Sequence, residues 1–505
     1  MSILGLFLTP QRQRKSFFLY RADTRIFYLH SIGLRFTVLY WTIRIRRYIA
    51  YLQIYCSILL FVVLTGCNLL PQRDTRDAGD AVPMYWRSTG QQDGPVPSKW
   101  TEIFNDSKLV ALVDTALANN YELKAAAARV DAAIAQARID GSPRWPQFFF
   151  TADHQQVQVR EAGFGSSRFS AFETIFGVSW EVDVWGRIRD LHQASLTEAE
   201  ASQSDFYGAR LSLAARVAQS YFELTEAKLQ VAITEQSIKD RTIIAKLVRG
   251  RFQRGLVRGL DLRLAMNDLA NAEAQLQAAR NRMQSLARQL EILLGRYPSG
   301  EDLAAEALPS LTTTVPAGLP SELLERRPDL VAAFSRLQAA DLRTVSAQKL
   351  RLPRITLTAS GGSRSVDLTE LVDPRAAAWN VFAGLMQPVF TGWRIEGEII
   401  RNQAQAEEAL NHYKNTALNA FREVEQALAA EEWLRQQEAA LKKAVEHTES
   451  SQKLAVYSYR NGVIEILTLL DSYRSTLNAQ TAHISVIRQL LSNRINLYLA
   501  LGGDA

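Results

Sequence analysis

Two stretches of the chain alternate between apolar and polar residues, as a β-strand with two unlike faces does. The clearer stretch is 176–184, and a weaker one covers 148–160. A Gly/Ser turn at 163–167 separates them, so the pattern predicts a β-hairpin over 147–185. Within 176–184 the apolar face holds Phe176, Val178, Trp180, Val182 and Val184, and the polar face holds Gly177, Ser179, Glu181 and Asp183.

The same arrangement occurs again later in the chain. Residues 355–360 alternate, and the run 379–390 follows a loop that contains Gly361, Gly362 and Pro374, which predicts a second hairpin over 354–391. We expect strands of about 10 residues, the length that crosses a membrane. Taken alone, the pattern fits a water-soluble hairpin with one face on a core equally well. Five tryptophans near the strand ends match an interfacial aromatic belt: Trp145, Trp180, Trp185, Trp379 and Trp393.

Very long helices follow each hairpin. Residues 188–247 contain Gly208 as their only Gly or Pro, and residues 395–459 contain only Gly397. Sixty helical residues make a rod of roughly 90 Å. Apolar and small residues recur at spacings of three and four, which predicts coiled-coil seams along Leu211, Ala214, Ala218 and Tyr221 and along Leu410, Tyr413, Ala417, Ala420, Val424 and Ala427. Returning helices are expected at 263–293 and 466–500, and an Ala-rich helix is expected from Asp106 to about Ile139, with its counterpart at 329–348.

The two halves of the chain are copies of one unit at a fixed offset of 207 residues. Residues that recur at this offset include Pro146 and Pro353, Arg187 and Arg394, Gly255 and Gly462, and Gly295 and Gly502. Such a unit does not bury its faces alone, so we expect one architecture with two similar halves. We divide the chain into an N-terminal extension and signal peptide (1–66), a tether (67–100), a first repeat (101–295), a linker (296–320) and a second repeat (321–505), with helical hairpins at 188–293 and 395–500.

The net charge of +6 does not indicate nucleic-acid binding. Residues 1–50 carry nine Lys or Arg against Asp23, a net of +8, and residues 51–66 carry no charge, so +6 minus 8 leaves −2 for residues 67–505. The basic charge thus lies ahead of a predicted cleavage site, and we expect no nucleic-acid partner. Cys56 and Cys67 are the only cysteines, which excludes a disulfide framework.

Residues 44–67 have the form of a secretory signal. A basic segment, Arg44–Arg47, precedes an apolar run at 51–64 that is too short for a comfortable membrane span of about 20 residues. The run ends in Leu64-Thr-Gly-Cys67, which resembles the bacterial lipoprotein processing box. That resemblance implies a covalent lipid on Cys67, and Asn68 favours the outer membrane. The alternative is an uncleaved anchor. Residues 1–42 fit no signal, and we favour a translation start further downstream over a cytoplasmic extension.

Four strands cannot close a barrel by themselves. An open sheet edge in hydrocarbon leaves backbone groups unpaired at several kcal/mol each, and the smallest single-chain barrels have about 8 strands. Strands in a membrane would therefore require an oligomer, with two chains supplying eight strands and three supplying twelve. The polar strand faces would then line water.

The chain resembles the TolC-like outer-membrane factors of tripartite efflux pumps, in the NodT-type lipoprotein branch. The resemblance is carried by Cys67, the segments 324–330 (LERRPDL), 185–187 (WGR) and 392–394 (GWR), and the tip segments 252–255, 459–462 and 467–471. It implies an α+β membrane protein that forms a homotrimer with a 12-strand β-barrel in the outer membrane and a helical α-barrel in the periplasm. It also implies a periplasmic adaptor and an inner-membrane transporter of the resistance-nodulation-division type as partners, and no cofactor besides the lipid.

The same resemblance assigns roles to residues at the periplasmic end. Leu467, Asp471 and Arg474 match a gate that narrows the duct, and the turns are expected to contact the adaptor through Arg254, Gly255, Leu256, Asn461, Gly462 and Val463. The alternatives are an ordinary solvated Asp471 and plain helical turns. Glu181 and Asp183 are expected to face the barrel lumen.

No catalytic motif accompanies these features. The six histidines are dispersed, and no metal-ligand spacing, phosphate loop or nucleophile elbow occurs, so we expect neither an enzyme nor a metal site. A passive exit duct is the leading interpretation. A periplasmic coiled-coil adaptor or a structural lipoprotein of an export complex is the alternative, although the duplicated hairpin-and-rod unit argues against an adaptor. A lipid-anchored hydrolase lacks any motif. The cargo stays open.

Overall fold

The computed structural model of this chain describes residues 73, 86–88, 99–161, 163, 165–311, 318 and 320–503. All of them belong to one compact unit, residues 70–505. The predicted extension and signal peptide (1–66) and the predicted lipid site at Cys67 lie outside the described residues.

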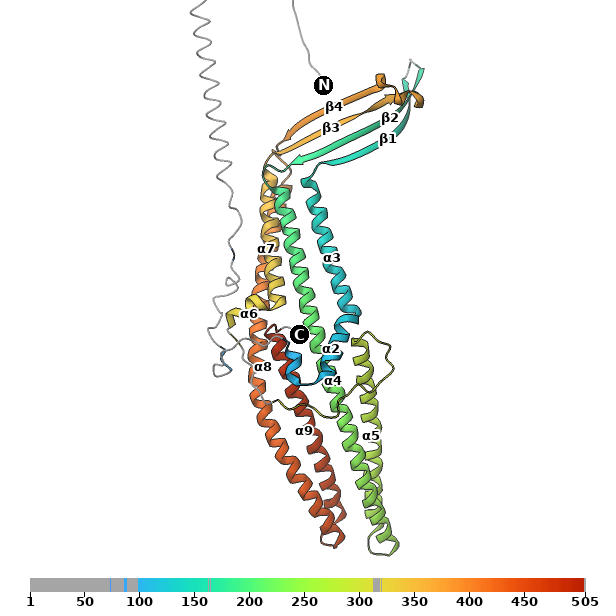
Figure 1. The fold of residues 1–505 in the computed structure, drawn as a ribbon, viewed down its shortest axis with the longest axis vertical. Helices are drawn as coiled ribbons and strands as arrows, with labels where there is room; N and C mark the ends of the chain where they lie inside the picture. Colours follow the sequence, from blue (N-terminus) through green and yellow to red (C-terminus); the bar gives the residue numbers. More distant parts are fainter. Residues whose placement is uncertain are drawn as a thin grey trace, which may run out of the picture. The chain divides into compact units, whose positions relative to one another are not determined.

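The long helices form two sets whose bounds differ by 207 residues (Figure 1). The expected helical rods are confirmed and extend a few residues further than the sequence pattern indicated. The helices of the first copy are α3 Tyr121–Gly141, α4 Arg187–Gln253 and α5 Gly259–Leu293. Their counterparts in the second copy are, in the same order, α7 Pro328–Gln348, α8 Arg394–Arg460 and α9 Ile466–Ala500. We call two residues 207 positions apart repeat equivalents.

The shorter elements complete the two copies. The 3-10 turns η3 Ser142–Arg144 and η4 Lys349–Arg351 are repeat equivalents and lead into the sheet. Helix α2 Ser107–Asn119 follows η2 Trp100–Phe104, and α6 Pro320–Arg326 precedes α7. In the second copy, η5 Leu368–Val372 and η6 Pro374–Ala376 occupy the loop between the two strands.

The expected single helix from Asp106 to Ile139 is wrong, because the chain breaks at Asn120. The side-chain oxygen of Asn120 accepts a hydrogen bond from the Leu123 amide at 3.1 Å, and its amide group donates to the Leu293 carbonyl at 2.9 Å. Asparagine competes with the helix ladder in this way, so it caps α3 instead of continuing α2.

Four antiparallel strands form one sheet in the order β1-β2-β3-β4. The strands are β1 Gln147–Glu161, β2 Gly165–Val182, β3 Arg354–Ser365 and β4 Ala377–Met386. The expected length of about 10 residues holds for β4 and is wrong for β1 and β2, which have 15 and 18 residues. The extra length is the polar end of the first hairpin, where the apolar alternation has stopped.

The two hairpins have equivalent registers. Gln147 pairs with Ser179, and their repeat equivalents Arg354 and Met386 pair with each other. At the base of each hairpin an equivalent side chain secures the turn, because Trp180 Nε1 donates to the Arg144 carbonyl at 3.1 Å and Gln387 Nε2 donates to the Arg351 carbonyl at 2.9 Å. The duplication is therefore kept at the level of single hydrogen bonds.

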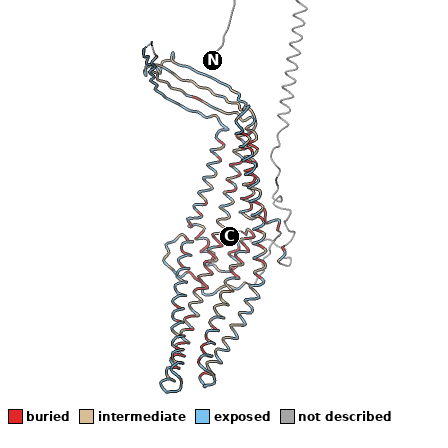
Figure 2. The backbone as a smooth tube through the Cα atoms, turned by 180° about the vertical axis from the view of Figure 1, so that it is seen from behind, coloured by how far each residue is buried: buried red, intermediate tan, exposed pale blue. Residues whose placement is uncertain are grey.

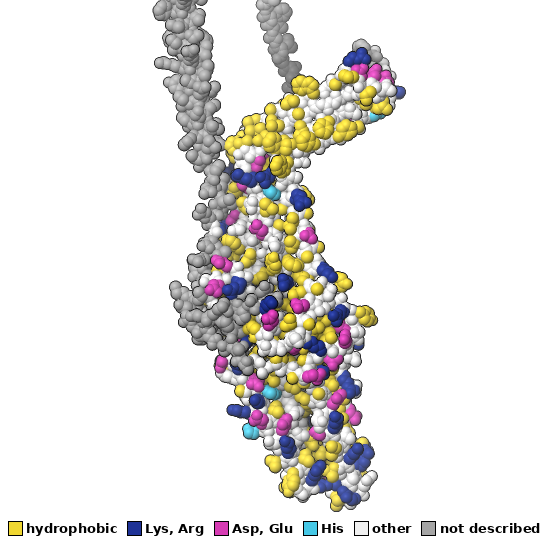
Figure 3. Space-filling model, in the orientation of Figure 1, with side chains coloured by type: hydrophobic (Ala, Val, Ile, Leu, Met, Phe, Trp, Pro, Cys, Tyr) yellow, Lys and Arg dark blue, Asp and Glu magenta, His cyan; other side chains and the backbone are white. Residues whose placement is uncertain are grey.

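The sheet has one apolar and one polar face. Residues paired across antiparallel strands share a face, so the register assigns each side chain. Hydrophobic side chains gather over the strands next to the helices, and charged side chains lie at the far end of the sheet (Figure 3). The apolar face includes Phe148, Phe150, Phe176, Val178, Trp180, Leu357, Trp379, Val381 and Leu385, and the polar face includes Gln147, Thr151, Asp153, Glu173, Ser179, Thr356, Thr358, Ser360 and Asn380.

Two aromatic rings on the polar face cover glycines. A Cβ on Gly177 would lie 2.2 Å from Cζ of Phe149, and a Cβ on Gly384 would lie 2.6 Å from Cε1 of Phe382. The rings shield strand backbone that has no side chain of its own, a known device for stabilising glycine in sheets.

Asp183 lies beyond β2 and does not take part in the sheet, contrary to expectation. Its carboxylate accepts hydrogen bonds from the amides of Ile188 at 3.1 Å and Arg189 at 2.7 Å, so it caps the first turn of α4. Glu181 stays in β2 and pairs with Arg187 at 2.8 Å. The strand-to-helix turn needs a left-handed residue, which is Gly186 in the first copy and Trp393 in the second.

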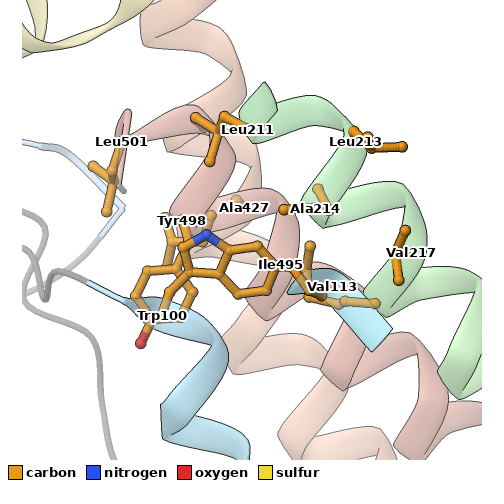
Figure 4. Close-up of a cluster of buried hydrophobic side chains, with 14 of the residues drawn as sticks. Trp100, Val113, Leu211, Leu213, Ala214, Val217, Ala427, Ile495, Tyr498 and Leu501 are labelled. Atoms are coloured by element: carbon orange, nitrogen blue, oxygen red, sulfur yellow. The ribbon is translucent and has the colours of Figure 1, made fainter. Parts of the chain in front are cut away.

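The largest core lies midway along the helices, where η2 and α2 pack against α4, α8 and α9 (Figure 2). Trp100 is fully buried, and its ring stacks on Tyr498 with centroids 6.1 Å apart (Figure 4). The seam residues Ala214, Ala218, Tyr221, Tyr413, Ala420 and Val424 are all buried, which confirms the predicted coiled-coil seams. Small residues in these seams let the helix backbones approach closely.

None of the helices in the described part of the chain is long and apolar enough to cross a membrane.

Candidate channel lining, tips and gate

Each helical hairpin ends in a turn of the same design. Gly255 and Gly462 both have positive φ, which lets the chain reverse after α4 and α8. The amides of Leu256 and Val463 bond back to the carbonyls of Arg251 and Ser458, each at 2.9 Å, as in a Schellman motif. The predicted tip residues therefore lie together in two exposed turns, with the side chains of Leu256 and Val463 turned to solvent.

The two turns are joined by an arginine that sequence reasoning missed. Arg251 Nη1 donates to the Tyr459 carbonyl at 3.0 Å, and Nη2 donates to the Arg460 carbonyl at 2.6 Å. Its guanidinium also lies 5.1 Å from the centroid of the Tyr459 ring. The end of α4 thus caps the last carbonyls of α8 and holds the two hairpins side by side. Nothing in the spacing of Arg251 marks it, since its repeat equivalent is Ser458.

A small core supports this junction. Ile244 and Val248 from α4 and Ala265 from α5 pack with residues of the second hairpin. Burial raises the pKa of the Tyr459 phenol, although the Arg251 charge opposes the shift. The residues of the second hairpin in this core are Tyr459, Ile466, Leu469, Leu470 and Tyr473.

The predicted gate residues form one exposed stripe at the start of α9. Leu467, Asp471 and Arg474 are spaced by four and three positions, so they lie on one helix face, opposite the buried Leu469 and Tyr473. Among the described residues, Asp471 has no hydrogen-bond or ion-pair partner. The arrangement leaves an apolar, an acidic and a basic side chain free to meet other copies of the chain.

Buried ion pairs fix the helices above the tips. Arg241 of α4 lies 3.0 Å from Asp268 of α5, and both side chains are buried. Glu431 of α8 pairs with the fully buried Arg494 of α9. Arg488 of α9 lies 2.8 Å from Glu226 of α4, which connects the two copies. Charges buried in this way need their partners, so these pairs restrict how the helices can pack.

The tether before α2 is attached to the second copy at several points. Arg73 forms a two-pronged contact with Asp341 of α7, with nitrogen-to-oxygen distances of 2.5 and 3.0 Å. The amides of Arg87 and Ser88 donate to the Glu425 carboxylate of α8 at 2.8 and 3.0 Å. Trp86 packs against Phe421, with ring centroids 6.2 Å apart. The described residues of the tether therefore contact α7 and α8.

The described residues contain no group of three or more His, Cys, Asp or Glu side chains placed to hold a metal ion. A sheet with one apolar and one polar face and coiled helices that end in exposed turns define a channel-forming protein of the outer membrane.

Comparison with known proteins agrees with this class. The model of the family described as "Outer membrane efflux protein" matches residues 112–296 and 319–503, which are themselves offset by 207. Outer membrane protein OprJ of Pseudomonas aeruginosa is 31% identical over 460 residues, which is 88% of this chain and 95% of that protein. A probable efflux pump outer membrane protein of Pseudomonas putida, TtgC, is 29% identical over 87% of this chain and 93% of its own length.

Solved structures show the same fold. The outer-membrane channel OprN superposes with a TM-score of 0.79 at 25% identity, over 86% of this chain and 98% of that one. The CmeC outer membrane channel of Campylobacter jejuni gives 0.79 at 25% identity, over 86% and 95%.

The chain belongs to the outer membrane efflux protein family. It is an outer-membrane exit channel of an efflux pump, in which three chains contribute four strands each to a 12-strand barrel. The apolar strand face meets lipid, and the polar face lines the duct. Members of this family are channels that work with periplasmic adaptors and inner-membrane transporters.

Proposed function

We propose that this chain forms a lipid-anchored, passive duct that a periplasmic adaptor couples to an inner-membrane transporter of the resistance-nodulation-division class. The single observation that carries the proposal is the amphipathic sheet with two free edges, continuous through Gly186 and Trp393 with helices of 67 residues each. A polar strand face offers a water-filled path that needs no chemical step.

The lipid anchor is proposed at Cys67. Arg73 is held at Asp341, and the six residue-to-residue steps from Cys67 to Arg73 can span about 20 Å when extended. Helix α7 rises about 10 Å from Asp341 to its last residue, Gln348. An acylated Cys67 would therefore reach past the end of α7 to the level of the strands, where lipid begins. Several acyl chains together give stable anchoring.

The gate is proposed at the exposed stripe of α9. In a trimer, three copies of Asp471 around a narrow opening repel one another and attract cations, and three copies of Leu467 can close it by excluding water. Arg474, one turn further along, would hold the ring in place. The turns around Gly255 and Gly462 offer exposed backbone and apolar side chains for the adaptor.

Three experiments test this function. Purification in detergent followed by sizing and planar-bilayer recording should give a trimer that conducts, and a monomer without conductance would overturn the duct. Radioactive palmitate should label the wild type and leave Cys67→Ala unlabelled; labelling of Cys67→Ala would overturn the lipid site. Co-purification with adaptors of different transporter classes tests the resistance-nodulation-division assignment, which binding only to another class would refute.

A further inference from the structure

We propose that a hollow in the wall of the duct binds organic cations through the carboxylate of Glu408 on α8. The hollow has a volume of about 480 Å³ and lies where α7 packs against both α4 and α8 (Figure 1). This size falls within the range of about 300–1,000 Å³ that is usual for small-molecule sites. The proposal rests on the duct proposed above and adds a class of cargo that the duct holds on its way out.

The helix face that carries the hollow is continuous with the polar face of the sheet. Arg187, Glu198 and Asp205 of α4 are spaced by eleven and seven residues, close to three and two helical turns, so they lie on one stripe. Arg187 begins the stripe and pairs with Glu181 at 2.8 Å, and Glu181 lies opposite Thr356 on the polar sheet face. Glu198 lines the hollow further along the same stripe. Since the polar strand face lines the duct, the hollow opens into the duct.

The attachment of the tether agrees with this assignment. Arg336 and Arg343 of α7 line the hollow and are two turns apart on one stripe. Asp341, which holds Arg73 of the tether, comes two residues before Arg343 and therefore lies about 160° away around the helix. The tether contact and the hollow are thus on opposite sides of α7, as the outer and inner surfaces of a tube wall are.

The positive charges of the hollow already have partners. Arg336 lies 3.5 Å from Glu198 and also pairs with Asp205, and Arg343 lies 3.1 Å from Glu198. These two arginines and two carboxylates cancel, so the additional carboxylate of Glu408 leaves one net negative charge, with histidine counted as neutral. A hollow with a net negative charge attracts cations and repels anions.

The carboxylate of Glu408 is available to a ligand. It is exposed and has no hydrogen-bond or ion-pair partner among the residues that the structure describes. Gln405 lies one turn earlier and also lines the hollow, so a cation at Glu408 can donate to the Gln405 amide oxygen. Asn402 is 7% exposed, and its amide group donates to the Glu398 carbonyl at 2.7 Å, which leaves its side-chain oxygen as a buried acceptor. A set of acceptors suits an ammonium group, which has only donors.

Small apolar side chains line the rest of the hollow. They are Ala333 and Ala340 of α7, which are buried, and Ala409 of α8. Alanines leave room for a compact ring system and offer it apolar surface to cover. The ligand class is therefore an ammonium group on a compact apolar body. Because the hollow opens into the duct, such a ligand is bound weakly enough to leave again, as conduction requires.

The first copy has no counterpart of this carboxylate. The repeat equivalent of Glu408 is Ala201, which is fully buried. Each chain therefore contributes one Glu408 hollow, and symmetry places the three hollows of a trimer at one level of the duct. An organic cation that moves along the duct meets three carboxylates at this level.

Calorimetric titration of the trimer in detergent tests the site. The probe is 1-adamantylammonium chloride, and 1-adamantanol carries a hydroxyl in place of the ammonium on the same apolar cage. After subtraction of a titration into empty micelles, the ammonium should bind at three sites per trimer and about fivefold more tightly than the alcohol. Glu408→Gln should lower the affinity for the ammonium to that for the alcohol. Glu407→Gln is the matched control and should bind as the wild type does, because Glu407 is exposed on α8 and does not line the hollow.

The outcomes separate this proposal from the proposed function. Equal affinity for the two probes, unchanged affinity in Glu408→Gln, or an equal loss in Glu407→Gln would overturn the cation site. The same preparation is recorded in a planar bilayer. A trimer that conducts and does not distinguish the ammonium from the alcohol overturns the site alone. A trimer that binds the ammonium at Glu408 and does not conduct overturns the duct and leaves the hollow as a cation site.

Discussion

Arg251 at the end of α4 holds Tyr459 at the end of α8 from two sides, with a hydrogen bond of 3.0 Å to its carbonyl and a guanidinium 5.1 Å from its ring centroid. The same guanidinium also donates to the Arg460 carbonyl at 2.6 Å, so one side chain joins the last turns of α4 and α8. A hydrogen bond from a charged donor to a carbonyl contributes about 2 kcal/mol. The contact therefore favours the joined arrangement of the two tips over the separated one by roughly 30-fold.

We therefore expect Arg251→Ala to increase single-channel conductance in a planar bilayer without adaptor, because the two hairpins lose their cross-link. Arg254→Ala is the matched control. Arg254 lies three residues further along, and its side chain bonds only to the Gly250 carbonyl of its own helix, at 3.2 Å. Equal conductance in both variants and the wild type would show that the Arg251 contact does not hold the tips together.

Asp471→Ala should raise conductance and antibiotic entry and reduce the preference for cations, since the variant removes three carboxylates from the proposed ring. The control is Asp114→Ala, an exposed carboxylate on α2 away from the tips. Bilayer recording in asymmetric salt measures both quantities. Unchanged conductance and ion preference in Asp471→Ala would refute the proposed role of Asp471 in the gate.

Glu431→Ala should destabilise the helices by about 3–5 kcal/mol, because it leaves the fully buried Arg494 without the carboxylate it pairs with. The neighbouring Glu432 is exposed and bonds to Gln436 one turn away, so Glu432→Ala should change stability by less than about 0.5 kcal/mol. Thermal unfolding followed by circular dichroism in detergent compares the two variants. Similar melting temperatures would mean that Arg494 finds another partner.

The loop after α5 should lose stability in acid. Burial alone would raise the pKa of Glu291, but hydrogen bonds from Ser299 Oγ at 2.5 Å and from the amides of Gly300 at 2.7 Å and Glu301 at 3.1 Å lower it below its ordinary value. A lowered folded-state pKa stabilises the fold above the ordinary value near 4.3, and this contribution disappears as the pH falls through the folded-state pKa.

Limited proteolysis at a series of pH values should accordingly show cleavage near residues 296–311 increasing below about pH 4. Glu291→Gln should be cleaved faster at neutral pH and show a flatter pH dependence, because an amide accepts these three hydrogen bonds less strongly than a carboxylate. A wild-type profile as flat as that of the variant would contradict the assignment.

Gly362→Ala should reduce the amount of trimer in the outer membrane. A Cβ on Gly362 would lie 1.9 Å from the carbonyl oxygen of Thr174, a backbone atom that moves only if β2 and β3 separate. Overpacking of this kind costs about 1–3 kcal/mol or more. Gly361→Ala is the matched control, since the nearest atom to its Cβ would be 3.9 Å away. The measurement is the amount of heat-stable trimer extracted from outer membranes. Equal amounts for the two variants would show that β2 and β3 can move apart to accommodate the methyl group.

Helix bounds and hairpin positions followed from the sequence because a repeat with a fixed offset reports both copies at once. The predicted element bounds were wrong where neither the repeat offset nor the apolar pattern carries a signal. Asn120 breaks a helix through its own side chain, and the start of β2, residues 165–172, has no regular alternation of apolar and polar residues.

The tip cross-link lay beyond sequence reasoning for a different reason. Arg251 has an unremarkable helical position, and its contact depends on where a helix more than 200 residues away ends. The gate proposed for Leu467 and Asp471 needs copies of the chain that meet at the axis, and in one chain their side chains are exposed on a common stripe.

The difference between Arg251 and its repeat equivalent Ser458 bears on how the periplasmic mouth widens. Serine is too short to make the contact that Arg251 makes, so this cross-link joins the two hairpins of one subunit, and Ser458 offers no equal contact to a neighbouring subunit. The six helical hairpins of a trimer therefore form three linked pairs, one pair in each subunit. We expect the periplasmic end to open first along the three lines between subunits.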